Sequence, residues 1–126
     1  MKLIRFQSRC PNLGTASQLG IFQLAYKLKY DPRTTREDDT RLREALEWLE
    51  WHLNAPDILE KHEHYRAICW FKDEAFKPIS QCWVIKQILE QYGYWVDLVK
   101  TRNPGLIIYQ DGWQVVAKPK KKNLRI

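Results

Sequence analysis

Asp111-Gly112 stands between two runs of β-forming residues, LIIY at 106–109 and WQVVAK at 113–118, and this pattern constrains the fold most strongly. An Asp-Gly pair in this setting predicts a two-residue type I′ β-hairpin, because both central residues of that turn take positive φ. Asn103-Pro104-Gly105 supplies the turn that leads into the hairpin. The chain is therefore expected to end its folded part with two antiparallel strands.

A two-residue turn also predicts the register of the two strands. It pairs Ile108 with Val115 and Leu106 with Ala117, and all four side chains then lie on one face of the hairpin. Three further strands are expected upstream, at 2–8, 66–71 and 94–99, from short alternating or apolar runs rich in β-branched and aromatic residues.

Three segments have helical patterns. Residues 36–54 carry an apolar stripe, acidic residues in the first turn and a Thr cap, and Pro56 ends the segment. Residues 74–92 form a third helical segment, which Gly93 ends. Residues 18–30 fit a helix capped by Ser17, but strict alternation fits them equally well; we predict a helix from their helix-forming residues.

The order of these elements predicts an α+β fold, βααβαβββ, with three helices packed on a small mixed sheet. The strand–helix–strand segment spanning 66–99 predicts a parallel strand pair joined by a right-handed crossover. With 126 residues, a single domain at 1–117 is expected.

The charge of the chain is concentrated at its C-terminal end. The chain holds 21 Lys and Arg against 15 Asp and Glu, for a net charge of +6. Five basic residues lie in 118–126 and no acid does, which leaves 16 basic and 15 acidic residues in 1–117, a net of +1. Residues 118–126 are expected to form a flexible basic tail.

Nucleic-acid binding is the alternative function that this charge suggests. The tail and a nearby loop would form one basic edge able to contact phosphates, although the body has no basic recognition helix. The candidate residues are Lys100, Arg102, Lys118, Lys120, Lys121, Lys122 and Arg125.

The cysteines, the N-terminus and the lack of long apolar runs predict the cellular compartment of the protein. The three cysteines, Cys10, Cys69 and Cys82, have no metal-ligand or redox-motif spacing, and Cys69 and Cys82 are expected to be buried and inert. The N-terminus is too short and too charged for a secretory signal, and no apolar run spans a bilayer. A cytoplasmic protein without a membrane partner is expected.

Several short runs in the second half of the chain carry a resemblance: CWFK at 69–72, Lys100-Thr101, Pro104-Gly105, Ile108-Tyr109, Asp111, QVVA at 114–117 and Pro119. Together they resemble a group of small bacterial proteins of uncharacterised function. The resemblance implies a bacterial, cytosolic single domain, and it assigns no activity, cofactor or site residue.

No catalytic constellation is evident. The sequence has no nucleophile-elbow, phosphate-loop or dinucleotide-binding motif. His62 and His64, with His52 upstream, would need a third protein ligand to hold a metal, so a solvated linker is the favoured interpretation. We therefore predict no cofactor and no metal, and an enzyme or metal protein built around His62 and His64 remains a third hypothesis.

Aromatic residues lie away from the apolar stripes of the predicted helices. At 100° per residue, Trp48 falls on the flank of the 36–54 helix and Trp51 on its polar face, while Phe76 and Trp83 lie opposite the stripe of the 74–92 helix. Either these faces pack on neighbouring helices, which we favour for Trp83, or they form an exposed docking patch, which we favour for Trp51. The leading hypothesis is a non-enzymatic accessory protein that binds a protein partner, or a second copy of itself, through this aromatic helical surface.

Overall fold

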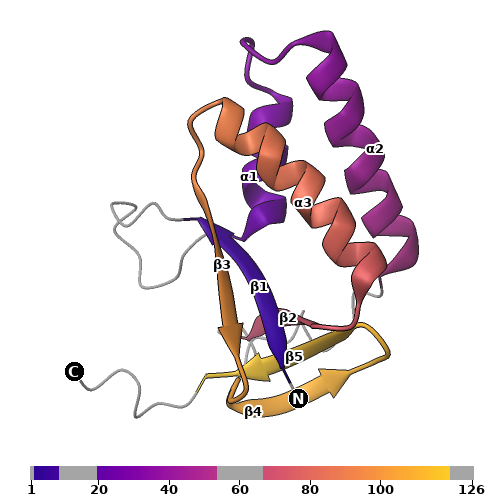
Figure 1. Cartoon of the computed structure of the whole chain (residues 1–126), viewed down its shortest axis with the longest axis vertical. Helices are drawn as coiled ribbons and strands as arrows, with labels where there is room; N and C mark the ends of the chain where they lie inside the picture. The colour runs from indigo at the N-terminus through magenta and orange to yellow at the C-terminus, as the bar shows by residue number, and fades with distance from the viewer. Residues whose placement is uncertain (1, 9–19, 54–66, 120–126) are drawn as a thin grey trace, which may run out of the picture.

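The fold combines one five-stranded sheet with three helices, in a computed structural model that describes residues 2–8, 20–53 and 67–119 (Figure 1). The strands are β1 (Leu3–Ser8), β2 (Ile68–Lys72), β3 (Val96–Thr101), β4 (Leu106–Gln110) and β5 (Gln114–Lys118). The helices are α1 (Ile21–Lys29), α2 (Arg36–His52) and α3 (Phe76–Gln91). The predicted α+β class, the three helices and the C-terminal hairpin are confirmed.

The sheet is antiparallel throughout, so the predicted mixed sheet is wrong. Its strand order is β3-β1-β2-β5-β4, and every neighbouring pair among these strands is antiparallel. As predicted, β2 and β3, which α3 connects, run in the same direction, because each is antiparallel to β1. However, β1 lies between them and pairs with both, so β2 and β3 are not neighbours.

The hairpin forms, but with a different turn and register. Gln110 pairs with Val115 and Tyr109 with Val116, and the Asp111 backbone N–H donates to the Gln114 carbonyl oxygen at 2.9 Å, so the turn is centred on residues 112–113 instead of 111–112 and the register is shifted by two positions. Gly112 is not among the glycines with positive φ, and the turn is therefore not type I′. The Asp111 carboxylate accepts hydrogen bonds from the backbone N–H groups of Trp113 and Gln114, both at 2.9 Å, and these bonds shape the turn.

The helices begin and end close to the predicted positions. Residues 21–29 are helical, as predicted, although the helix starts after Gly20, and the proposed cap Ser17 lies outside the described residues. Thr35 caps α2, because its Oγ1 accepts the Asp38 backbone N–H at 3.2 Å. Gly93, with φ of +89°, follows the last turn of α3.

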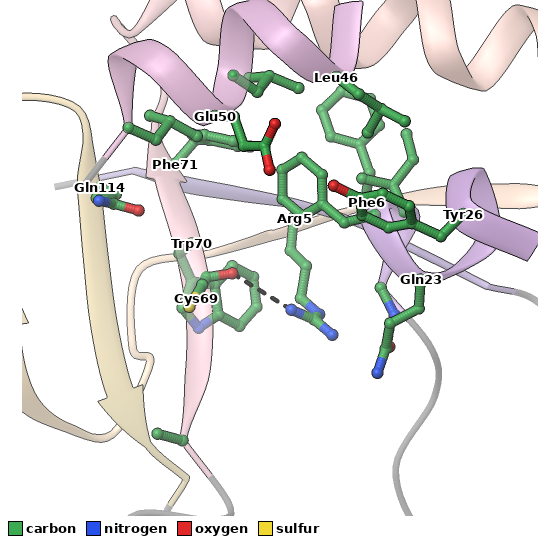
Figure 2. Close-up of a pocket in the computed structure, with 16 residues that line it drawn as sticks. Arg5, Phe6, Gln23, Tyr26, Leu46, Glu50, Cys69, Trp70, Phe71 and Gln114 are labelled. Carbon is green, nitrogen blue, oxygen red and sulfur yellow. Dashed lines mark hydrogen bonds between the residues drawn. The ribbon is translucent and has the colours of Figure 1, made fainter. Parts of the chain in front are cut away.

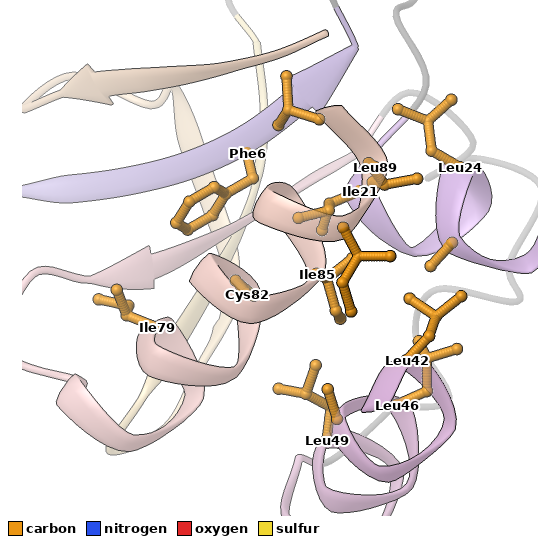
Figure 3. Packing of buried hydrophobic residues seen from close by; sticks show 14 of the residues in the cluster. Phe6, Ile21, Leu24, Leu42, Leu46, Leu49, Ile79, Cys82, Ile85 and Leu89 are labelled. Carbon is orange, nitrogen blue, oxygen red and sulfur yellow. The ribbon is translucent and has the colours of Figure 1, made fainter. Parts of the chain in front are cut away.

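The main hydrophobic core lies between the helices and one face of the sheet (Figure 3). It joins side chains from all three helices to Phe6 of β1 and Phe71 of β2, with Cys82, Ile85 and Leu89 of α3 fully buried. A second, smaller cluster contains Leu3, Trp70 and Val115; Phe71, next to Trp70, belongs to the main core, and Val116, next to Val115, is also fully buried. Because successive residues of a strand point to opposite faces, both faces of the central strands are buried.

Candidate functional site

The predicted aromatic residues lie in two different environments. Trp48 is half-buried and packs within the protein: its ring stacks on that of His52, with centroids 4.1 Å apart and an interplanar angle of 12°. The ring of Trp113, from the turn between β4 and β5, lies 5.8 Å from that of Trp48. The Trp48 ring therefore packs α2 against the hairpin, and it is less exposed than the rings of Trp51 and Phe76.

The ring of Trp83 packs on the sheet. Its ring meets that of Phe6 edge to face, at 5.5 Å and 87°, and Lys86 Nζ lies 5.8 Å from its centroid. The side chain remains 42% exposed. The packing on a neighbouring helix that we favoured for Trp83 is therefore wrong: the aromatic partner of its ring is Phe6 of β1.

Trp51 and Phe76 are the most exposed of the four, at 83% and 74%. Figure 1 shows that α2 ends where α3 begins, so both residues lie at the same end of the helical layer. A shallow cavity of about 300 Å³ lies at that end, lined by Trp48, His52, Lys77, Ser80, Gln81 and Trp113. We call Trp48, Trp51, His52, Phe76 and Trp113 the aromatic end of the molecule.

The aromatic end has acidic neighbours. Glu44 and Glu47 are exposed on α2, and Glu47 stands one helical turn before Trp51. Asp73 and Glu74 are exposed directly before α3. Lys77 is the basic residue lining the cavity. Among the described residues, no cation lies within ion-pair distance of any of these four carboxylates. Each can therefore pair with a cation of a binding partner.

Sequence reasoning missed a larger cavity, of about 500 Å³, where β1 and β2 separate (Figure 2). Its lining includes Arg5 of β1, Cys69 of β2 and Glu50 of α2. Cys69 is exposed here, so its predicted burial is wrong, whereas Cys82 is buried as expected. In the sequence, Arg5 is an ordinary polar residue of an alternating strand. It lines a cavity only because β1 and β2 separate beside it.

The basic residues of the alternative hypothesis are placed only in part. Lys100 and Arg102 are exposed and Lys118 is half-buried at the end of β5. A Cβ built on Gly105 would lie 2.1 Å from the Lys118 carbonyl oxygen, so the loop after Arg102 passes directly beside Lys118. The remaining candidates, Lys120, Lys121, Lys122 and Arg125, lie outside the described residues.

The structure gives no positions for two of the three histidines that the metal hypothesis invokes. His62 and His64 lie outside the described residues. His52 is exposed, and its Nδ1–H donates to the Trp48 carbonyl oxygen at 2.7 Å. Across residues 2–8, 20–53 and 67–119, no three metal-ligating side chains come together.

Comparison of the chain with protein-family models, curated proteins and solved structures gives no match. Of the helices described, none has both the length and the apolar character needed to cross a membrane.

Proposed function

We propose that this chain is a non-enzymatic binding protein that docks a basic segment of a protein partner at its aromatic end. The observation that carries the proposal is the 83% exposure of Trp51, a side chain with a large apolar surface, on a helix face that also holds Glu44 and Glu47. Exposed tryptophan of this kind is strongly enriched among residues that dominate binding energy at protein interfaces.

The charge around the aromatic end favours a basic partner. Four carboxylates, those of Glu44, Glu47, Asp73 and Glu74, are exposed near the aromatic end, whereas Lys77 is the basic residue that lines its cavity. Complementary charge raises the association rate and excludes acidic partners, while the aromatic rings supply the contact area. The Trp48 ring stacks on that of His52 and lies at a tilt to that of Trp113, and all three residues line the cavity at this end of the molecule, so a partner would meet a preformed surface.

Two short peptides with the same apolar residues test this proposal, one carrying Lys and Arg and the other carrying Asp and Glu. We expect fluorescence anisotropy to show that the basic peptide binds and the acidic one does not. Trp51→Ala is expected to weaken binding about thirtyfold, which corresponds to roughly 2 kcal/mol for a dominant contact residue.

Tyr30→Ala is the matched control, because Tyr30 is an equally exposed aromatic residue, at 78%, just after the last residue of α1. Equal binding of the two peptides, or equal losses in the two variants, would overturn the proposal. Light scattering separates a second copy from a foreign partner. A dimer that Trp51→Ala dissociates would assign the surface to self-association and overturn docking of a basic partner.

Nucleic-acid binding is the second candidate, and the approach of Gly105 to Lys118 favours it. That approach joins the loop carrying Arg102 to the strand from which the basic tail continues. The candidate predicts sequence-independent DNA binding that weakens steeply between about 50 and 200 mM salt. Deletion of residues 118–126 should weaken it, because the basic residues Lys100 and Arg102 remain, and unchanged binding after the deletion would eliminate this candidate.

A further inference from the structure

The large cavity exists because β1 and β2 pair over a very short length. Leu3 pairs with Lys72 and Ile4 with Phe71, and the register between the two strands ends there. Beyond that point β1 continues along β3, and β2 continues along β5. In Figure 1 the two halves of the sheet diverge, with β1 and β3 nearly vertical and β4 and β5 nearly horizontal.

The space between the diverging strands is largely apolar. Its walls come from the inner faces of α1 and α2 and from β2, with Ile21, Leu46, Leu49, Leu53 and Phe71 among the lining side chains. A volume of about 500 Å³ falls in the range of about 300–1,000 Å³ that is typical of small-molecule sites. Such sites combine an apolar wall with few polar groups that fix the orientation of the ligand.

Arg5 is the polar group that spans the opening. Its Nη1 donates to the Cys69 carbonyl oxygen at 3.3 Å, and its Nε donates to Gln7 Oε1 at 3.1 Å. Figure 2 shows the guanidinium between Cys69 of β2 and Gln23 of α1. In the described part of the chain, Nη2 has no hydrogen-bond acceptor and no carboxylate lies within ion-pair distance of Arg5.

Arg5 is half-buried, and this burial has an electrostatic consequence. Desolvation lowers the pKa of Arg5 below its usual value, and the Cys69 side chain opposes that change. The pKa of the Cys69 thiol is raised by desolvation, so Cys69 stays neutral and supplies no counter-charge near neutral pH. A partly desolvated guanidinium without a carboxylate partner gains more from an incoming anion than a solvated one does.

We propose that this cavity binds a small amphipathic carboxylate, with its charged group on the Arg5 guanidinium and its apolar body against Leu46, Leu49 and Phe71. The fork of guanidinium N–H donors matches the two oxygens of a carboxylate. Glu50 lines the same cavity from α2. Its charge disfavours a doubly charged phosphate more than a single carboxylate, and this difference selects the ligand class.

Decanoate, decanol and decyl phosphate, each below its micelle-forming concentration, are the probes. Titration followed by methyl NMR is expected to show saturable shifts at Leu46 and Leu49 with decanoate. Decanol should bind at least tenfold more weakly, and decyl phosphate more weakly than decanoate. Arg5→Met should weaken decanoate binding about ten- to hundredfold, as expected for loss of a charge-assisted hydrogen-bond pair.

Arg36→Met, at the exposed start of α2, is the control and should leave decanoate binding unchanged. Glu50→Gln provides a second variant at an exposed position, in case Arg5→Met fails to fold, and it should raise affinity for decanoate but not for decanol. Equal binding of decanoate and decanol, or equal affinity of Glu50→Gln and the native chain, would overturn the proposal. Trp51 does not line this cavity, so the Trp51 variants test the aromatic end and not the Arg5 site.

Discussion

Gly105 fills a position where a side chain has no room. Its φ is +107°, and a Cβ built there would lie 2.1 Å from the Lys118 carbonyl oxygen and 3.0 Å from the Pro119 Cα. Gly105→Ala therefore combines an unfavourable backbone conformation with a backbone clash. We expect it to lower the free energy of unfolding by about 2–4 kcal/mol, measured by chemical denaturation.

Gly112→Ala is the matched control in the same hairpin. No atom lies within 4 Å of a Cβ built on Gly112, and its φ is not positive. Its effect on the free energy of unfolding should stay within about 0.5 kcal/mol. If the two alanine variants were equally stable, the close approach of Gly105 to Lys118 would be wrong.

Asp111 holds the hairpin turn through several hydrogen bonds. Partial burial alone would raise the pKa of this carboxyl group, but bonds from the Trp113 and Gln114 backbone N–H groups and from the Tyr109 and Gln114 side chains outweigh it. The net pKa of Asp111 is therefore lower than usual. A carboxyl group with a depressed pKa stabilises the fold above its unfolded pKa of about 4, and this contribution is lost as pH falls through the folded value.

Asp111→Asn removes this titration, because the amide does not ionise. We expect the variant to be less stable than the native chain at pH 7, and the difference to shrink as the pH falls below about 4. Thermal unfolding followed by circular dichroism across that range measures it. Parallel pH profiles for the two proteins would show that the carboxylate does not stabilise the turn.

At the scale of elements, a cap and a long side chain tie α2 to α3. Thr35 Oγ1 caps α2, and the Tyr92 hydroxyl accepts the Thr35 backbone N–H at 3.0 Å while donating to Asp38 Oδ2 at 2.7 Å. Thr35→Ala should lower the free energy of unfolding by about 1 kcal/mol. Thr40→Ala, on the exposed face of the same helix, should have no destabilising effect, since alanine is the better helix former.

A comparison of these two variants by urea denaturation tests the cap directly. Equal stability of Thr35→Ala and the native chain would mean that the Tyr92 hydrogen bonds, without the threonine hydroxyl, hold this helix end.

The elements themselves could be predicted because their signals are local. The apolar stripe and first-turn acids of 36–54 specify α2 within a few residues, and Gly93 marks the end of α3. The turn type could not be predicted, because Asp-Gly also suits a turn held by the Asp111 carboxylate. The Tyr109 and Gln114 side chains donate hydrogen bonds to that carboxylate, and the observed pairing is shifted by two positions from the one that a turn centred on Asp111-Gly112 requires.

At the scale of the whole molecule, strand order and the cavity escaped prediction for the same reason. The β2–α3–β3 segment predicts that β2 and β3 run in the same direction. Nothing within that segment indicates that β1, more than sixty residues upstream, pairs with both strands. The cavity lining comes from five separate elements, α1, α2, β1, β2 and, through Gln114, β5. Of the aromatic candidates, Trp51 followed from helical spacing alone, because a residue opposite an apolar stripe is exposed unless another element covers it.

Cys82 reports on the integrity of the whole core. It is fully buried within α3, and burial raises the pKa of its thiol to about 12, so almost no thiolate forms near neutral pH. We expect iodoacetamide to label exposed Cys69 in the native protein, at a rate slowed by the raised pKa of its thiol, and to label Cys82 at least about a thousandfold more slowly than in denaturant. Peptide mass mapping distinguishes the sites, and comparable labelling of both cysteines would contradict the packing of α3 on the sheet.

The proposed docking of a basic partner at the aromatic end depends on Trp51, which lies at its surface. The most direct test is a two-dimensional NMR titration with the basic peptide that follows the six indole Nε1–H resonances, one per tryptophan. We expect the resonance of Trp51 to shift most, while that of Trp70, buried in the small cluster, stays in place. Saturable binding that leaves the Trp51 resonance unmoved would contradict it.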